Sequence, residues 1–328
     1  MKKVIVYGNC HTGILIDYLE RSRDFRNKYE IIHIPQIQEI YNAGNKSSIH
    51  DVCFESCDVF IHQSIQKNNR YGEEYASERI IKRLKKGCIV IAIPNLYGLP
   101  ICVFPQCVLN QSLYLFGEVF FFRDRLIEKL VNEKRNIEDI CVAYQEDMSV
   151  FPEEDLVMGR EQFLDKVKRR EEDWDVKIYD YIKRNMDKRL FYDPNHPTNL
   201  LLEHVIEELC KKLGVSIDLA AVRRNVYRAL DTYEMPLCAP VAKLYGVKNQ
   251  GLRESYGGRK IGLRTMTIKQ YVECYIAALW ENNELVGPFA SEGKRIYYVL
   301  SVRRLISLPI KKCINLFYAV NRRLWLAM

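Results

Sequence analysis

The chain has 328 residues, 48% of them hydrophobic, so it is long enough to bury a sizeable core as one large domain or two. Its 49 Lys and Arg against 42 Asp and Glu give a net charge of +7, which favours anionic partners without selecting among them. No RNP-like strand, basic helix-turn-helix or zinc-finger spacing accompanies this excess, so we expect no nucleic-acid partner.

The N-terminal residues do not have the pattern of a targeting segment. Met1 leads almost at once into a short strand-like run, without the roughly 7–15 apolar residues that a signal peptide needs. The eleven cysteines are odd in number and scattered, as is typical of reduced thiols in a cytosol-like compartment. Loose spacings such as that of Cys53 and Cys57 argue against zinc. We therefore expect a cytoplasmic protein without a metal site.

Strands and helices alternate in the N-terminal part. The sequence predicts strands over 2–8, 29–35, 57–65 and 87–95, and helices over 12–22 and 73–86. The nearly continuous β-branched runs at 31–34 and 89–93 are expected of strands covered on both faces. This alternation predicts an α/β fold with a parallel sheet flanked by helices, which binds ligands at the carboxyl ends of its strands.

The following part is predicted to be mainly helical. From about residue 117 to 190 the pattern is dense in Glu, Lys and Arg, which indicates solvated helix faces. A further helix is expected to have Pro197 in its first turn and to stop at Gly214. His196 therefore lies at a helix entrance.

Three polar stretches lie at the ends of predicted elements. They are Gly8-Asn9-Cys10-His11, Pro94-Asn95 and Asp193-Pro194-Asn195-His196. A cysteine in the first turn of a helix lies near backbone N–H groups and the positive end of the helix dipole, which increases its thiolate fraction. Cys10 is therefore a candidate nucleophile. The alternative is that this small side chain lets the strand and the helix pack closely.

His196 is the candidate general base. Asp193 lies three residues before it and can hold one ring nitrogen, as in a catalytic triad. The alternative is that Asp193 caps the turn and His196 packs locally. Asn95, together with a main-chain N–H near Cys10, is a candidate donor to an oxyanion. It is equally well explained as a turn residue after Pro94.

Four motifs follow one another along the chain: "GNC" from residue 8, "DVFIHQSI" from 58, "IAIPNLYG" from 91 and "NHPTNLLLEHV" from 195. Their order and separation resemble the WcbI-type family of capsular polysaccharide biosynthesis proteins. The resemblance covers roughly residues 1–215, which we expect to form an α/β catalytic domain, followed over 216–328 by a largely helical extension. It implies coenzyme A binding and acetyl transfer, with Cys10 and His196 as the family's motif cysteine and histidine.

The layout is also similar, more distantly, to the SGNH hydrolase fold, in which the nucleophile is a serine. Cys10 in that place favours acyl transfer through a thioester over ester hydrolysis. Many members of the WcbI-type family have Gln where this chain has His11, so His11 either binds substrate or competes as the base. Gln63, on an otherwise apolar strand, is either a core amide or a substrate-binding group, and the resemblance favours the second.

We therefore expect transfer of an acetyl group from acetyl-coenzyme A to a sugar hydroxyl of a capsular or related surface glycan. Cys10 would be the nucleophile, His196 the base and Asp193 the group that orients it. The expected oxyanion and substrate-positioning residues are Gly8, Asn9, His11, Gln63, Asn95 and Asn195. The alternatives are a carbohydrate esterase, in which water replaces the sugar, and a non-enzymatic module that binds coenzyme A or a glycan.

The last segment, residues 293–328, carries eight Lys or Arg and no acidic residue among aromatic and aliphatic side chains. Pro309 is expected to divide it into two helical pieces. The second piece has the pattern of a helix that rests on an anionic membrane surface. That arrangement would suit a lipid-linked glycan acceptor and peripheral attachment to the inner membrane face. The alternative is a helix that docks on the body and keeps its charges in water.

Overall fold

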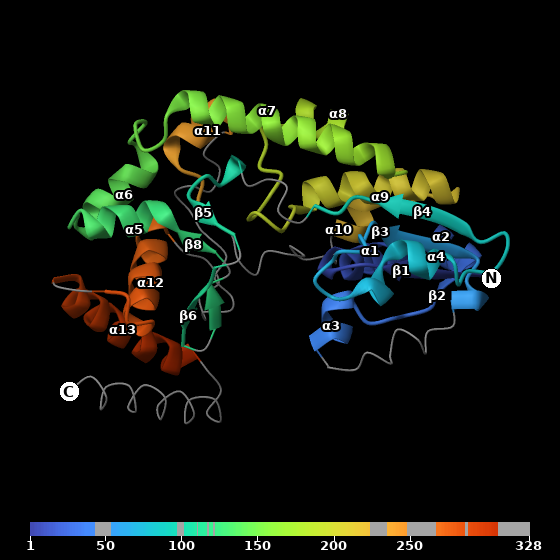
Figure 1. Ribbon diagram of the computed structural model, residues 1–328, viewed down its shortest axis with the longest axis horizontal. Coiled ribbons are helices and arrows are strands. Elements are labelled where there is room, and N and C mark those ends of the chain that lie inside the picture. The colour runs from blue at the N-terminus through green and yellow to red at the C-terminus, as the bar shows by residue number, and fades with distance from the viewer. Residues whose placement is uncertain are drawn as a thin grey trace. The chain divides into compact units, whose positions relative to one another are not determined.

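The computed structural model divides into two compact units, which Figure 1 draws as ribbons. It describes residues 1–42, 54–96, 102–109, 111–116, 118–120, 122–223, 235–247, 267–285 and 288–307. The N-terminal unit contains Met1–Leu99, Glu161–Phe191 and Asn195–Leu230, and the C-terminal unit contains Pro100–Arg160, Tyr192–Pro194 and Asp231–Met328. The boundary expected at residue 215 does not coincide with this division, because Pro100–Arg160 packs with the C-terminal part.

A four-stranded parallel sheet forms the centre of the N-terminal unit. Its strands are β1 (Lys2–Tyr7), β2 (Tyr29–Ile31), β3 (Val59–Gln63) and β4 (Ile89–Ile93), in the order β2-β1-β3-β4. The register places Tyr7 opposite His62 and Gln63 opposite Ile93, so β1, β3 and β4 end at one edge of the sheet. The predicted α/β fold with a parallel sheet flanked by helices is confirmed.

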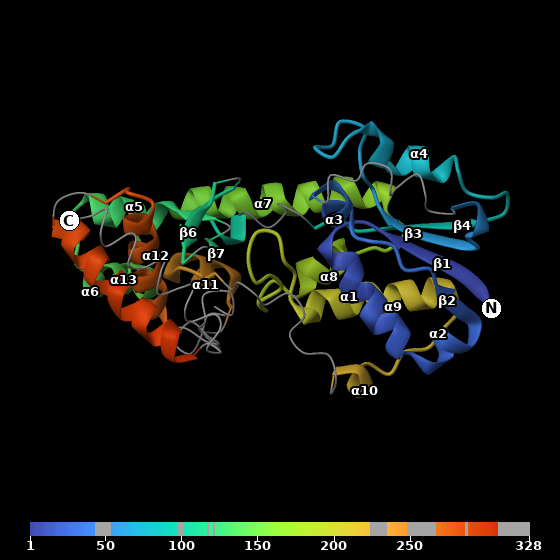
Figure 2. The same cartoon turned by 90° about the horizontal axis from the view of Figure 1, so that it is seen from below.

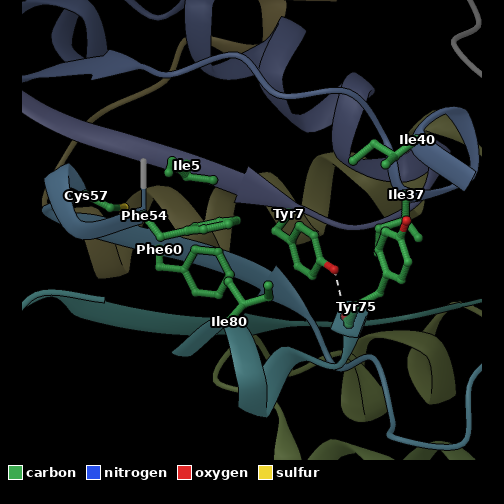
Figure 3. Packing of buried hydrophobic residues seen from close by; sticks show 9 residues of the cluster. All are labelled: Ile5, Tyr7, Ile37, Ile40, Phe54, Cys57, Phe60, Tyr75 and Ile80. Atoms are coloured by element: carbon green, nitrogen blue, oxygen red, sulfur yellow. Dashed lines mark hydrogen bonds between the residues drawn. The ribbon is translucent and has the colours of Figure 1, made fainter. Parts of the chain in front are cut away.

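Helices cover both faces of this sheet. The N-terminal unit contains the helices α1 (Cys10–Arg21), α2 (Arg23–Lys28), α3 (Ile37–Asn42), α4 (Ser77–Ile81), α8 (Tyr179–Arg184), α9 (Asn199–Leu213) and α10 (Leu219–Arg223). Figure 2 shows α1 and α9 on one face and α4 on the other. Successive strand residues point to opposite faces. Ile5 and Tyr7 of β1 therefore pack with Phe60 of β3 and Ile80 of α4 in the buried cluster of Figure 3, while Val4 and Val6 are buried on the opposite face.

The two edge strands are less covered than the central ones. In β4, Ile89 is 48% and Val90 37% exposed, although Ile91 to Ile93 are buried. Residues 31–34 are half-buried or exposed. The prediction that 31–34 and 89–93 are covered on both faces is therefore wrong for the whole first run and for the start of the second. The first run begins at the last residue of the edge strand β2 and continues past the sheet, and the second run forms the other edge strand, β4.

The helix that follows the "NHPT" motif begins later than predicted. The N-cap of α9 is Thr198, so Pro197 precedes the cap and does not occupy the first turn. The helix ends, as predicted, at Gly214, whose φ of 64° lies in the left-handed region that favours glycine. His196 thus lies two residues before the cap, in a loop that a bridge between Phe191 and Pro197 ties back on itself.

The C-terminal unit is largely helical, as predicted. Its helices are α5 (Arg125–Asn132), α6 (Ile137–Gln145), α11 (Ala239–Tyr245), α12 (Ile268–Glu281) and α13 (Pro288–Ser307), and α7 (Glu153–Arg170) begins in it. Two short antiparallel pairs were not predicted: β5 (Cys107–Val108) with β8 (Arg123–Asp124), and β6 (Leu113–Leu115) with β7 (Glu118–Phe120). In the described part of the chain, no helix is both long enough and apolar enough to cross a membrane.

The first piece of the predicted basic tail belongs to α13 and packs on α12. The ring of Tyr297 lies 4.8 Å from that of Trp280 and 4.7 Å from that of Phe116. A Cβ atom at Gly293 would lie 2.9 Å from the Cβ of Trp280, so glycine permits the close approach of the two helices. These contacts support the docking alternative for residues 293–301. The second piece, after residue 309, lies outside the described residues.

Two neighbouring tyrosines of α13 provide a matched test of this packing. Tyr297 is 2% exposed and Tyr298 is 52% exposed. Tyr297→Ala is expected to lower the free energy of unfolding by about 3–5 kcal/mol, because it removes a buried aromatic side chain. Tyr298→Ala is expected to change it by less than about 0.5 kcal/mol. Urea titration of both variants measures the difference, and equal effects would contradict the docked position of α13.

Candidate active site

A cysteine and a histidine from distant parts of the sequence meet at the carboxyl edge of the sheet. Cys10 is the first residue of α1, just after β1, and its Sγ lies 3.8 Å from Nε2 of His196. This is within hydrogen-bonding range for sulfur, and both side chains are partly buried. The structure therefore brings together the two residues that the sequence analysis selected as nucleophile and base.

Asn9 holds the start of α1. Its Oδ1 accepts a hydrogen bond from the main-chain N–H of His11 at 3.1 Å, as expected of an N-cap residue. Its Nδ2 donates to Oδ1 of Asn95 at 3.4 Å, and its main-chain N–H donates to Oε1 of Gln63 at 2.8 Å. The N–H of Asn9 is thus already engaged. The N–H of Cys10, the first residue of α1, has no hydrogen bond to any described residue.

Gln63 is a fully buried amide that links the ends of three strands. Besides accepting from Asn9, it donates through Nε2 to the main-chain oxygen of Pro94 at 3.1 Å, and the same atom lies 3.4 Å from Nδ1 of His11. Gly8 leaves the space that this side chain occupies, because a Cβ at Gly8 would collide with Oε1 of Gln63. These contacts place Gln63 in the core. Of the two alternatives for this residue, a core amide and a substrate-binding group, they agree with the core amide.

His11 follows Cys10 on α1 and is 2% exposed. Its Nε2 lies 2.9 Å from the main-chain oxygen of Asn195. A carbonyl oxygen only accepts hydrogen bonds, so Nε2 carries the proton and Nδ1 accepts from Gln63. Burial, with a smaller contribution from His196, lowers the pKa of His11 from 6.5 to about 3. His11 is therefore neutral near pH 7, and hydrogen bonds engage both of its ring nitrogens.

The buried His11 makes a prediction about stability and pH. Its pKa of about 3 in the folded protein lies below the value of 6.5 expected for the unfolded chain, so the unfolded state binds more protons between these values. The stability is therefore fully present above pH 6.5 and is lost as the pH falls. Below pH 6.5, His11 alone is expected to lower the free energy of unfolding by about 1.4 kcal/mol per pH unit.

Urea unfolding of the wild-type protein and of His11→Gln from pH 7 to pH 4.5 measures this contribution. Glutamine keeps one donor and one acceptor without a titrating ring, so the variant is expected to show a shallower decline in stability. His33→Gln is the control, because the ring of His33 is exposed and pairs with Glu20 on the surface. A decline in His11→Gln as steep as in the wild type would contradict the burial of a neutral His11.

The stretch from Asp193 to His196 is divided between the two units. Asn195 belongs to the N-terminal unit and gives its main-chain oxygen to His11. Asp193 is fully buried and belongs to the C-terminal unit. The expected role of Asp193 in orienting His196 stays a prediction.

One buried polar residue of the turn was missed in the sequence. Thr12 is 2% exposed, and its Oγ1 donates to the main-chain oxygen of Asn9 at 2.7 Å. A threonine in the first turn of a helix, where side chains often bond the local backbone, is the signal that could have indicated it. Among the residues that the structure describes, no group of three His, Cys, Asp or Glu side chains could hold a metal ion. Cys53 lies outside the described residues.

The fold and the site together define a class: a parallel α/β protein with a thiol–imidazole pair at the carboxyl end of its first strand. The family profile described as polysaccharide biosynthesis enzyme WcbI matches residues 3–218, and the chain belongs to this family. The resemblance stated from the motifs is thereby confirmed. No curated protein matches the chain.

One solved structure is similar to the chain over nearly its whole length. It is WcbI, described as a novel polysaccharide biosynthesis enzyme, in a native form without a disulfide bond between coenzyme A and one of its cysteines. The TM-score is 0.68 at 20% sequence identity, and the match covers 92% of this chain and 96% of that one. This similarity confirms the fold, including the largely helical C-terminal part.

Proposed function

We propose that this chain transfers an acetyl group from acetyl-coenzyme A to a sugar hydroxyl in the synthesis of a capsular or other surface polysaccharide. The observation that carries the proposal is the 3.8 Å contact between Cys10 Sγ and His196 Nε2 at the start of α1. Membership of the WcbI family supports the polysaccharide context. The description of the WcbI structure in terms of coenzyme A and a cysteine supports the donor.

In the first step Cys10 accepts the acetyl group. His196 takes the proton of the Cys10 thiol, and the resulting thiolate attacks the acetyl carbonyl of the donor. The N–H of Cys10 and the amide of Asn95 are the proposed donors to the oxyanion that forms. When the carbon–sulfur bond of the donor breaks, His196 returns the proton to the thiolate of coenzyme A. The products of this step are acetylated Cys10 and free coenzyme A.

In the second step His196 takes the proton of the sugar hydroxyl as the oxygen attacks the thioester on Cys10. The carbon–sulfur bond to Cys10 breaks, the acetyl ester of the sugar leaves, and the proton restores the Cys10 thiol. The roles of the surrounding residues follow from their contacts. Gly8, Asn9, His11 and Gln63 position the turn, and the carbonyl of Asn195 anchors the loop of His196.

The proposal places the reaction at the cytoplasmic face of the membrane, where acetyl-coenzyme A meets a lipid-linked glycan. Residues 293–328 carry eight basic residues and no acidic one, which suits an anionic leaflet. Residues 293–301 belong to α13, which packs on α12. Membrane contact is therefore proposed for the part of this tail that follows α13.

Release of coenzyme A from acetyl-coenzyme A, measured with and without a glycan acceptor, tests the proposed activity. Release that needs the acceptor, with a mass increase on the glycan, is the expected result. Equal release in water alone, with hydrolysis of nitrophenyl acetate, would indicate the carbohydrate esterase instead. Calorimetric binding of coenzyme A without any product would indicate the binding module.

A further inference from the structure

We infer that His11 is a positioning residue. Its neutral ring, held by Gln63, donates a hydrogen bond from Nε2 to the carbonyl of Asn195, and this bond, here called the clamp, sets the distance between His196 and Cys10. The inference rests on the proposed roles of Cys10 and His196. It goes beyond them, because it gives His11, the residue after the proposed nucleophile, the role of holding the proposed base in place.

The clamp begins at Gln63, whose amide can take only one orientation. Its Oε1 faces the N–H of Asn9 at 2.8 Å, and its Nε2 faces the carbonyl of Pro94 at 3.1 Å. Rotating the amide by 180° would place oxygen against oxygen and N–H against N–H. Nε2 of Gln63 must therefore present its second hydrogen to His11.

The ring of His11 then has a fixed tautomer. Nδ1 accepts from Gln63 at 3.4 Å, and Nε2 donates to the oxygen of Asn195 at 2.9 Å. A proton on Nδ1 would face the amino group of Gln63, so the network excludes both the cationic ring and the other neutral tautomer. The ring of His196, 6.3 Å from that of His11, also opposes a charge there.

The clamp acts at the residue next to the proposed base. Asn195 precedes His196, and on the other side the loop is held by hydrogen bonds of Thr198 to the carbonyls of Leu190 at 2.8 Å and Arg189 at 3.0 Å. His11 in turn follows Cys10 on α1. One helix turn therefore carries both the nucleophile and the donor that fixes the loop of the base, which couples the positions of their side chains.

Iodoacetamide labelling of Cys10, followed by peptide mapping, tests the inference without any acetyl donor or acceptor. Loss of the clamp in His11→Leu is expected to slow Cys10 labelling about tenfold, because His196 no longer stabilises the thiolate. His11→Gln, which keeps a donor and an acceptor, is expected to label within about threefold of the wild-type rate. His204→Leu is the matched control, since Nε2 of His204 also bonds a main-chain oxygen, that of Lys177, at 3.1 Å but outside the site.

A double-mutant comparison separates positioning from general damage. In the His196→Ala background, His11→Leu is expected to slow Cys10 labelling no further, since the clamp acts through His196. A further slowing there, or slowing by His204→Leu to the same extent, would overturn the inference. Because labelling needs no turnover, the labelling result stands even if the chain transfers no acetyl group. Likewise, acetyl transfer can be measured even if His11 proves not to position His196.

Nitrogen NMR of the wild-type protein with labelled histidine provides a test that no folding defect can obscure. The inference requires His11 to remain neutral with its proton on Nε2 from pH 7 down to pH 5. Protonation of His11 in that range, or a proton on Nδ1 of the neutral ring, would overturn it.

Discussion

Cys10→Ala is expected to reduce acetyl transfer by about 10³-fold or more, because the proposed thioester cannot form without the thiol. The same variant is expected to keep its fold, since Cys10 is a small, partly buried residue at the start of α1 and Asn9 supplies the helix cap. The measurement is the rate of coenzyme A release with a glycan acceptor present. Mass spectrometry of the wild-type protein, quenched during turnover, is expected to find the acetyl group on the peptide that contains Cys10.

Cys88→Ala is the matched control for this variant. Cys88 is also a partly buried free cysteine, but it lies just before β4, away from the carboxyl edge of the sheet. It is expected to leave the rate of transfer unchanged. Turnover by Cys10→Ala at the wild-type rate would exclude a covalent role for Cys10, and acetyl transfer would then have to proceed directly from the donor to the sugar.

His196→Ala is expected to lower the rate of acetyl transfer by about 10²- to 10⁴-fold, the usual contribution of a positioned general base. In the same variant iodoacetamide labelling of Cys10 is expected to slow, because the 3.8 Å contact between Nε2 and Sγ is lost. In the wild-type protein Cys10 is expected to be labelled faster than Cys141, since burial raises the pKa of the Cys141 thiol to about 11.

His204→Ala is the control for His196→Ala. It separates the loss of the contact with Cys10 from the general effect of removing a partly buried histidine. The ring of His204 stacks on Tyr181 at 4.0 Å, so its removal is expected to lower stability without changing the labelling of Cys10. If His196→Ala transferred acetyl groups as fast as the wild type while Cys10→Ala was inactive, another group would have to be the base. His11 would not qualify, because both its ring nitrogens are engaged.

Much of the N-terminal unit could be predicted from local patterns. The short β-branched runs and the turn after Tyr7 predicted β1, β3, β4 and α1 within a few residues, because strand propensity and helix caps depend on neighbours in the sequence. The bounds failed where packing overrides propensity. The predicted helix over 73–86 is only a 3₁₀ turn, Glu73–Tyr75, followed by α4.

The roles of Gln63 and His11 could not be predicted in the same way. A glutamine on an apolar strand is compatible with a core amide and with a substrate-binding group, and only its contacts with Asn9 and Pro94 distinguish the two. A histidine beside a cysteine likewise suggests a base. Its tautomer depends on the hydrogen bond to Asn195 and its lowered pKa depends on burial, and no local pattern reveals either.

The sequence by itself determined the elements and the chemical groups available: a parallel α/β unit, a cysteine at the first turn of its first helix, and a histidine before a helix that ends at Gly214. The tertiary structure alone decided which of these groups meet. Cys10 and His196 are 186 residues apart, and their contact depends on the packing of α9 beside α1, which brings the loop before α9 to the start of α1. Such contacts arise from the packing of the whole unit, and desolvation on packing is also what makes His11 a neutral donor.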